Sequence, residues 1–194
     1  VQEGDVVLDL GASIGPFTWK IMDKASKVYA VEAGKECWEP LEANTKGFNV
    51  EIVKNFIGTE NKKFLYNNGC VSEDSPTDIV ESIRFSEFLK RYNVDRIDYI
   101  KTDCEGGEYA LFQDENMEFL TTKVRDIVGE FHLSHGNPLL KVEFRYWRDK
   151  YLTQFPYYKV FSVDGVDITW NLFSDNFINF YNEVYFHISN SKVE

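Results

Sequence analysis

The chain has 194 residues, of which 43% are hydrophobic and 16% aromatic, and its formal net charge is −11. This length suits one domain with a buried core, and the composition is typical of globular proteins. The negative charge argues against a nucleic-acid partner and against an anionic membrane surface, because both bind a basic face.

Three cysteines, Cys37, Cys70 and Cys104, form no CxxC pair. Their odd number indicates reduced thiols, and it predicts a cytoplasmic location with neither a disulfide framework nor a zinc site. No apolar run reaches the ~18 residues of a membrane span. We expect no signal peptide at the start of the chain. We expect one domain over residues 1–194. Because it starts almost on its first strand, an upstream segment is expected to have been removed or to belong to a longer protein.

The residues Val6–Thr18 form the first informative stretch. The apolar run Val6–Leu10 predicts a buried strand, and Gly11–Gly15 with Pro16 after it predicts a tight turn that opens a helix. A strand, a glycine turn and a helix start together are typical of a nucleotide-binding corner. The turn lacks the middle glycine of a pyrophosphate site, GxGxxG, because its sequence is Gly-Ala-Ser-Ile-Gly.

Asp9 stands at the carboxyl end of that strand, two residues before the turn. Its carboxylate would repel a pyrophosphate and attract an ammonium or sulfonium group. S-adenosylmethionine (SAM) carries both cations and no phosphate, so SAM is the ligand that fits this corner. The alternative is a purely structural corner in which Asp9 is an N-cap acid.

A helix is expected from Pro16 to about Ala25, and Lys27–Ala33 predicts a second strand that ends near Glu32. Glu32 lies about 20 residues beyond the glycine turn, where a dinucleotide fold places a carboxylate for the ribose hydroxyls. The alternative is that Glu32 only favours the start of the next helix through the helix dipole. That helix is expected to end near Lys46.

The third predicted strand, Val50–Ile57, ends in Asn55, Phe56 and Ile57. These residues offer an amide and an apolar edge that suit an adenine ring. Residues 58–78 are polar and rich in turn formers, so we expect them on the surface.

The second informative stretch is Ile97–Glu108, which follows a short helix predicted over Phe85–Tyr92. Its strand is expected to end at Asp103, and a double glycine then precedes a helix that continues to about Leu120. A further strand, Ile127–Leu133, is expected to end in an acid and a histidine. Ligands of open α/β sheets bind at the carboxyl ends of the strands. The side chains expected at that edge are Asp9, Glu32, Asp103, Glu130 and His132.

An amphipathic helix over Leu139–Phe155 and strands over Tyr158–Val163 and Glu183–Ile188 complete the predicted elements. The aromatic-rich segment Trp170–Tyr181 is expected to belong mainly to the core. Some aromatic rings in this half of the chain could instead stack on a sugar, namely Tyr146, Trp147 and Trp170.

Four motifs carry a family resemblance: Gly4–Thr18 (GDVVLDLGASIGPFT), Val31–Ala33 (VEA), Ile97–Glu108 (IDYIKTDCEGGE) and Glu130-Phe-His132. Together they resemble the class I SAM-dependent methyltransferases, and within that class the FkbM family. The resemblance implies a Rossmann-like α/β fold with helices on both faces of a seven-stranded, mostly parallel sheet that includes one antiparallel strand. It also implies O-methylation of a hydroxyl on a sugar or natural-product-like small molecule.

The resemblance further implies which residues contact SAM. The expected contacts are Asp9, Gly11, Ala12 and Gly15 for the methionine part, Asp103 below the sulfonium, Glu32 for the ribose, and Asn55, Phe56 and Ile57 for the adenine.

An alcohol is a poor nucleophile, so a general base is expected, and His132 suits neutral operation through its reference pKa of about 6.5. Asp103 competes for this role. The alternative for His132 is a purely structural role, in which its hydrogen bonds are satisfied at the end of its strand. In another mechanism Asp103, Glu130 and His132 bind Mg²⁺ or Mn²⁺, which lowers the pKa of the alcohol.

Two other classes of function stay open at this point. One is an NAD-dependent oxidoreductase or epimerase, against which the missing glycine and Asp9 argue. The other is a catalytically silent SAM-fold module that binds a partner and shows no turnover.

Overall fold

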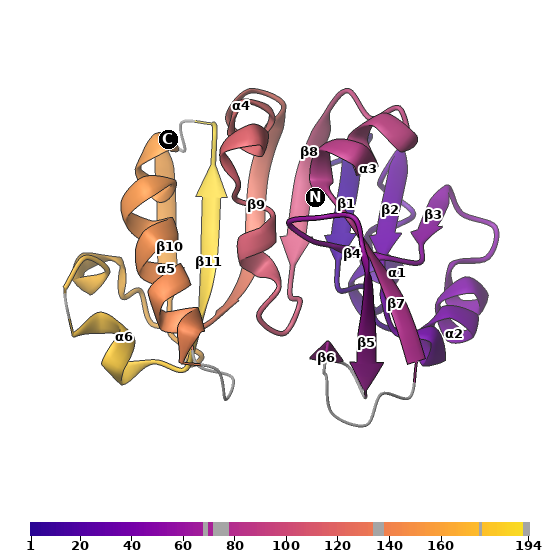
Figure 1. The fold of residues 1–194 in the computed structure, drawn as a ribbon. Coiled ribbons are helices and arrows are strands. Elements are labelled where there is room, and N and C mark those ends of the chain that lie inside the picture. The colour runs from indigo at the N-terminus through magenta and orange to yellow at the C-terminus, as the bar shows by residue number, and fades with distance from the viewer. Residues whose placement is uncertain (68–69, 72–77, 134–137, 175, 192–194) are drawn as a thin grey trace. The chain divides into compact units, whose positions relative to one another are not determined.

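The computed structural model describes residues 1–67, 70–71, 78–133, 138–174 and 176–191. The fold is α/β, and its main, mostly parallel sheet has seven strands in the order β10-β11-β9-β8-β1-β2-β3. Together with the helices of Figure 1, this strand order confirms the Rossmann-like fold expected from the sequence. The chain divides into two compact units, residues 1–101 and 102–194, and each is described in turn.

The first unit builds the corner around the glycine turn. Its elements in chain order are β1 (Val6–Leu10), α1 (Pro16–Ile21), β2 (Lys27–Val31), α2 (Lys35–Thr45), β3 (Val50–Val53), β4 (Phe56–Ile57), β5 (Lys63–Asn67), β6 (Cys70–Val71), β7 (Asp78–Ile83), α3 (Phe85–Arg91) and β8 (Ile97–Thr102). β1 pairs in parallel with β2, and β2 pairs in parallel with β3. Because parallel neighbours need a crossover, a helix follows each of the first two strands.

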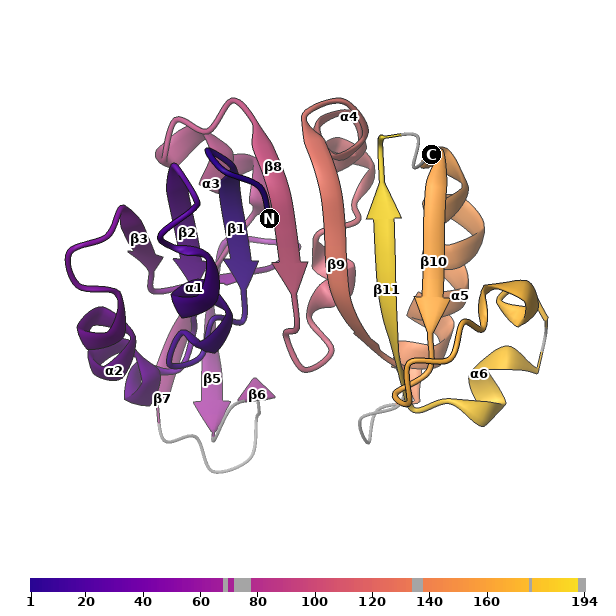
Figure 2. The same ribbon diagram turned by 180° about the vertical axis from the view of Figure 1, so that it is seen from behind.

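Neighbouring side chains of β2 explain the layers of this unit. Val28 packs with Ile21 and Met22 at the end of α1, whereas Tyr29 meets Phe88 of α3 with ring centroids 5.4 Å apart. Successive residues of a strand point to opposite faces of its sheet, so α1 and α3 cover opposite faces. Accordingly, α3 lies nearer the viewer in Figure 1 and α1 nearer the viewer in Figure 2.

The single strand expected over Val50–Ile57 is wrong, because the structure forms two strands there. β3 ends at Val53, and β4 pairs in parallel with β7 in a separate four-stranded sheet of order β4-β7-β5-β6. Between them, Nδ2 of Asn55 donates to the carbonyl oxygen of Glu81 at 3.1 Å, which ties the break to β7. Within the segment expected on the surface, β5, β6 and the start of β7 are described, and residues 68–69 and 72–77 lie outside the described part.

The second unit is built on β9 (Val124–His132), which pairs antiparallel with β11 (Glu183–Ser189), and β11 pairs antiparallel with β10 (Tyr157–Phe161). β11 is therefore the antiparallel strand that the family resemblance implied. The helical elements of this unit are η1 (Glu108–Ala110), α4 (Asp114–Thr122), α5 (Leu139–Lys150), η2 (Leu152–Gln154), η3 (Thr169–Asn171) and α6 (Phe177–Phe180). The helix expected to follow the double glycine is thus two elements, η1 and α4.

Aromatic rings fill the core of the second unit. Phe131 of β9 packs on Phe186 of β11 and on Trp147 of α5, with ring centroids 4.3 and 4.0 Å away. Trp147 is 1% exposed, so its interpretation as a stacking surface for a sugar is wrong. Tyr146 and Trp170 are exposed and keep that possibility.

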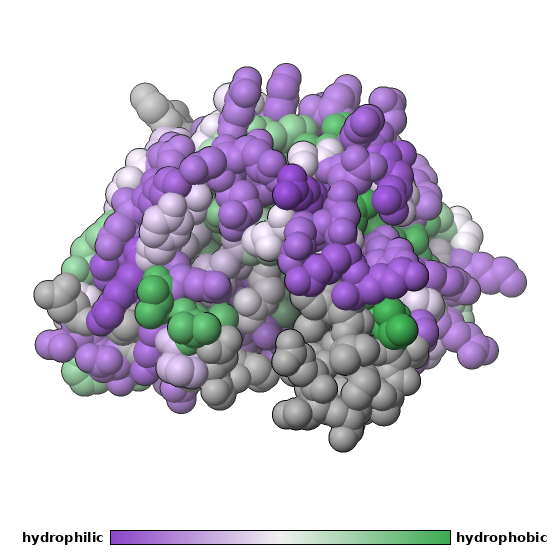
Figure 3. Space-filling view, viewed as in Figure 1, coloured by the Kyte–Doolittle hydropathy of each residue, from purple (hydrophilic) through white to green (hydrophobic). Residues whose placement is uncertain are grey.

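The described surface is mainly polar. Hydrophilic residues cover most of it in the view of Figure 3, as the charge of −11 predicts. Its ion pairs include exposed contacts such as Lys54–Glu42, which contribute little to stability. Among the helices that the structure describes, none has the length and apolar character needed to pass through a membrane.

Candidate functional site

The glycine turn after β1 has an unusual backbone. Gly11, Ser13 and Gly15 have φ angles of 72°, 51° and 91°, in the left-handed region where glycine is favoured. The N–H groups of Gly11 and Ala12 both donate to the carbonyl oxygen of Val31 at 3.0 Å, which closes the turn onto the end of β2. Ala12 is buried, whereas Ser13 is exposed, so the turn presents Ser13 outward.

Asp9 lies at the base of this turn with its carboxylate fully enclosed. Its Oδ2 accepts a hydrogen bond from Oγ1 of Thr18 at 2.6 Å, and its Oδ1 lies 3.4 Å from Nζ of Lys101. The lysine compensates the charge of the carboxylate. The sequence suggested that Asp9 attracts a ligand cation directly, but its carboxylate has no exposed surface for such a contact. In the structure Asp9 contacts Thr18 of α1 and Lys101.

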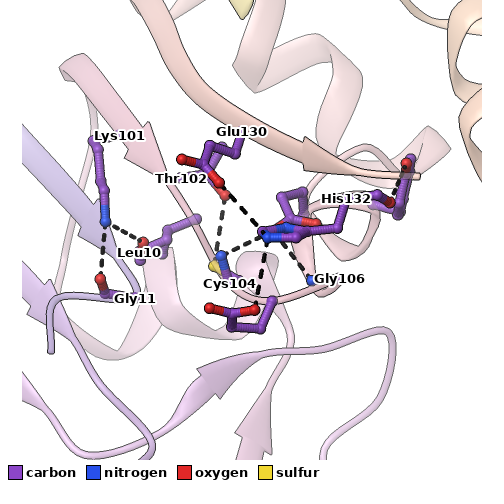
Figure 4. A network of polar contacts seen from close by, with 11 residues as sticks. Leu10, Gly11, Lys101, Thr102, Cys104, Gly106, Glu130 and His132 are labelled. Atoms are coloured by element: carbon purple, nitrogen blue, oxygen red, sulfur yellow. Dashed lines mark hydrogen bonds and ion pairs between the residues drawn. The ribbon is translucent and has the colours of Figure 1, made fainter. Parts of the chain in front are cut away.

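Lys101 of β8 also contacts the backbone of the turn. Its Nζ donates to the carbonyl oxygens of Gly11 at 2.9 Å and of Leu10 at 3.4 Å (Figure 4). Sequence reasoning gave this lysine no role. The available signal was a lysine near the carboxyl end of the strand motif IDYIKT, beside the expected ligand-binding edge.

Glu32 stands beside the turn at the end of β2. Its Oε2 accepts a hydrogen bond from the N–H of Ser13 at 2.7 Å, and its Oε1 accepts one from the N–H of Gly34 at 2.6 Å. A carboxylate oxygen has two lone pairs, so each can accept a further hydrogen bond from a hydroxyl. The half-buried, fixed carboxylate could therefore accept two hydroxyl donors, and its contact with a ribose stays a prediction.

The three residues expected at the adenine lie at the break between β3 and β4. The amide donor of Asn55 is used by Glu81, Phe56 is half-buried and Ile57 is 7% exposed. They offer an apolar edge with one amide, which is the chemistry expected of them, and their contact with adenine stays a prediction.

A second set of polar side chains gathers around His132 at the end of β9 (Figure 4). The ring is 4% exposed, and its Nδ1 lies 2.9 Å from Oε1 of Glu108, which is itself buried. Its Nε2 lies 3.6 Å from Oε2 of Glu105 and 3.6 Å from Oε2 of Glu130. One imidazole thus faces three carboxylates.

This environment shifts the pKa of His132. Burial by itself lowers that pKa, but the hydrogen bond with Glu108 and the charges of Glu108, Glu105 and Glu130 outweigh burial and raise it to about 9. Burial and the nearby charge of Asp103 raise the pKa of Glu130. This shift favours a protonated ring at pH 7, in contrast to the titration near neutrality expected from the sequence, and it favours Asp103 over His132 as the base. The base role of either residue stays a prediction.

Glu108 organises the loop that carries Asp103. Its Oε1 accepts hydrogen bonds from the N–H groups of Cys104 at 2.9 Å and Gly106 at 3.2 Å, in addition to its contact with His132. Glu105 and Gly106 adopt φ angles of 53° and 99°, so the loop turns sharply around this oxygen. Asp103 directly follows β8 and is half-buried.

Among the residues that the structure describes, the same cluster contains two sets of atoms that could hold a metal ion. His132 shares one set with Asp103 and Glu105 and the other with Glu130 and Glu183, and the ligand atoms of each set lie within 4.8 Å of one another. Carboxylates with one imidazole suit Mn²⁺ or Mg²⁺, and the contact from Glu108 to Nδ1 is the kind of outer contact that orients a ligating histidine. The predicted trio Asp103, Glu130 and His132 is thus divided between two sets.

We compared the chain with known protein families. The model of the methyltransferase FkbM domain matches residues 9–154, which is more than half of the chain. The chain belongs to the FkbM methyltransferase family. The matched range starts at Asp9 and contains the glycine turn, Glu32, Lys101 and the cluster around His132 apart from Glu183. Membership in a methyltransferase family supports SAM as the cofactor and disfavours the NAD-dependent alternative.

Solved structures share the fold of this FkbM chain at low sequence identity. An rRNA methylase from Streptococcus thermophilus is 10% identical, with a TM-score of 0.55. The alignment covers 97% of the FkbM chain and 88% of the methylase. SMU.1697c from Streptococcus mutans, solved in complex with SAH, is 8% identical with a TM-score of 0.53, and the covered shares are 97% and 90%.

A curated relative of the FkbM chain matches only a short stretch. It is a probable ribosomal RNA small subunit methyltransferase A from Thermococcus gammatolerans, which is 39% identical over 54 residues. The match covers 28% of the FkbM chain and 19% of that relative. It therefore supports methyltransferase chemistry but does not identify the acceptor.

Proposed function

We propose that this chain is a SAM-dependent O-methyltransferase that acts on a hydroxyl of a sugar or natural-product-like small molecule. The observation that supports it best is Glu32, whose carboxylate is fixed by the N–H groups of Ser13 and Gly34 beside a left-handed glycine turn. This arrangement suits the ribose of an adenosine, and the turn lacks the middle glycine that a pyrophosphate site needs.

In our proposal, residues of the first unit make the cofactor contacts. Gly11, Ala12 and Gly15 shape the turn, and exposed Ser13 belongs to the part that faces the methionine portion. Asp9 supports the turn from below through Thr18 and Lys101. Glu32 accepts hydrogen bonds from the ribose, and Asn55, Phe56 and Ile57 border the adenine.

In the reaction, bound SAM supplies the methyl group as a sulfonium, and the acceptor oxygen must be aligned with it. Asp103 accepts the hydroxyl proton in our proposal, because its carboxylate follows β8 directly and His132 is already protonated at pH 7. His132 then acts as a cation that holds Glu105 and Glu130 in place. Alignment of the two reactants contributes several kcal/mol of the rate enhancement.

A divalent metal is an alternative occupant of the cluster around His132. His132 would hold it together with Asp103 and Glu105, or together with Glu130 and Glu183. Mg²⁺ or Mn²⁺ would there lower the pKa of a bound alcohol. The metal would need Nε2 of His132 without its proton, so the metal and the proton exclude each other. Rate measurements in a strong chelator, followed by added Mn²⁺ or Mg²⁺, separate the two. Full activity in chelator would exclude the metal mechanism.

The acceptor is proposed to be uncharged instead of a nucleic acid. The chain carries a net charge of −11, and the acids Asp103, Glu105, Glu130 and Glu183 surround His132. Phosphate groups would be repelled by both. RNA is nevertheless the acceptor named for the curated relative, so the experiment must include it.

Labelled SAM with separate pools of glycans, RNA and protein tests this proposal. We expect label mainly in the glycan pool, as an alkali-stable ether. Label chiefly in RNA would show that the acceptor assignment is wrong while the methyltransferase assignment is right. SAM binding without label in any pool, including small-molecule polyols, would instead support a catalytically silent module.

A further inference from the structure

The turn that we assign to SAM is held on both sides by contacts within the chain. On one side, the N–H groups of Gly11 and Ala12 donate to Val31, and the carbonyl oxygen of Ala12 accepts from the N–H of Gly15 at 2.9 Å. On the other side, the carbonyl oxygens of Leu10 and Gly11 accept from Nζ of Lys101. The contacts with Val31 are ordinary hydrogen bonds between backbone groups. The contacts on the other side come from a single side chain that is distant in the sequence.

Lys101 combines two tasks at this position. Its side chain is 18% exposed, and its ammonium lies between two backbone carbonyls and the enclosed carboxylate of Asp9. The ion pair neutralises a buried charge. The contacts with the carbonyls fix the orientation of the peptide groups at Leu10 and Gly11, just before the left-handed residues that present Ser13 to Glu32.

We propose that Lys101 is a positioning residue for the cofactor: it fixes the carbonyls of Leu10 and Gly11 so that the glycine turn is ordered before SAM binds. This inference rests on the proposed function, because it takes SAM as the ligand of the turn. An ordered turn binds its ligand more tightly because less conformational entropy is lost on binding. The ion pair with Asp9 keeps the lysine in reach of both carbonyls and leaves the pair without net charge under the ligand.

The decisive comparison separates the two tasks of Lys101. Lys101→Met removes both the charge and the carbonyl contacts, whereas Asp9→Asn/Lys101→Met removes the contacts without leaving a buried charge. Lys27→Met is the matched control, because it removes a lysine paired with Glu51 on a strand of the same sheet, away from the turn. Lys101→Arg tests rescue by another cation.

SAM dissociation constants are measured by calorimetry, thermal unfolding gives the stability, and hydrogen exchange reports on the amides of Gly11 and Ala12. We expect roughly tenfold weaker SAM binding in both variants that carry Lys101→Met. The double variant should recover most of the lost thermal stability without recovering affinity. Both should exchange the two amides faster, Lys101→Arg should recover part of the affinity, and the control should match the wild type.

Wild-type SAM affinity in the double variant would overturn the proposal, because Lys101 would then only neutralise Asp9. Unchanged amide exchange in that variant would overturn it as well. If the wild-type chain binds no SAM, the proposed function fails, whereas the exchange rates still decide whether Lys101 orders the turn.

Discussion

The glycine turn of the first unit and the cluster around His132 in the second unit treat charge in opposite ways. At the turn, each carboxylate is matched in place: Asp9 by Lys101 and Thr18, and Glu32 by two backbone N–H groups. Around His132, one imidazole faces the carboxylates of Glu105, Glu108 and Glu130.

This difference indicates which of the two sites can respond to its surroundings. A compensated, hydrogen-bonded turn is preorganised and should bind a ligand with little change of its own. A cluster with excess negative charge needs a proton or a cation, so its state depends on pH and on metal ions. We therefore expect cofactor affinity to follow the first site and turnover to follow the second.

The largest expected effect is the loss of turnover in Asp103→Asn. If Asp103 is the general base, the rate should fall by about 10²–10⁴-fold, while the dissociation constant of SAM changes little. Glu118→Gln, an exposed substitution on α4, is the control. Turnover of Asp103→Asn within a few-fold of the wild type would remove the base role.

The pH dependence of stability should distinguish the two sites next. Because the pKa of His132 in the folded chain is about 9 and the reference value is about 6.5, its stabilising contribution is complete below about pH 6.5 and disappears as the pH rises through 9. Urea unfolding in chelator should show that the wild type loses on the order of 3 kcal/mol relative to His132→Gln over this window. Parallel stability curves for the two proteins would contradict the assigned protonation.

Glu32→Ala should weaken SAM binding at the turn. Loss of a charge-assisted hydrogen bond costs about 1.5–3 kcal/mol, which is roughly a tenfold to hundredfold rise in the dissociation constant. At saturating SAM, turnover should stay near the wild-type rate. Glu36→Gln on α2 is the matched control, and equal SAM affinity in both variants would remove Glu32 from the cofactor site.

The smallest effect concerns the shape of the turn. In Gly15→Ala, the new Cβ would lie 2.8 Å from Cδ1 of Leu41, and the residue would have to keep a φ angle of 91°. We expect a loss of about 1–3 kcal/mol in the free energy of unfolding. Gly4→Ala is the control, because Gly4 also has a positive φ but no atom near its Cβ position. The backbone cost is common to both, so equal losses would show that Leu41 yields without cost.

Sequence patterns predicted the fold well where local signals agree with packing. The apolar run before Gly11, the glycine turn and Pro16 correctly gave β1 and α1, although α1 ends earlier than expected. The strand expected over Val50–Ile57 failed because the residue pattern of this segment does not reveal that the chain leaves one sheet for another. That change depends on the pairing of β4 with β7, which is a distant contact.

The candidate sites were predicted only as far as residue type allows. Glu32, Asp103 and Glu130 could be found from their positions at strand ends. The pKa of His132 could not, because it depends on Glu108, whose contact with the ring forms only in the fold. Burial of Trp147 and the contacts of Lys101 with the turn likewise arise from packing between distant segments.

An NMR titration of the backbone amides with SAM tests the central claim most directly. Ser13 and Gly34 donate their N–H groups to Glu32, so their resonances should shift when a ribose binds to that carboxylate. We predict saturable shifts at both amides with SAM and none with NAD. SAM binding that leaves both resonances unmoved, or saturable shifts at these amides with NAD, would contradict the assignment of this corner to the methyl donor.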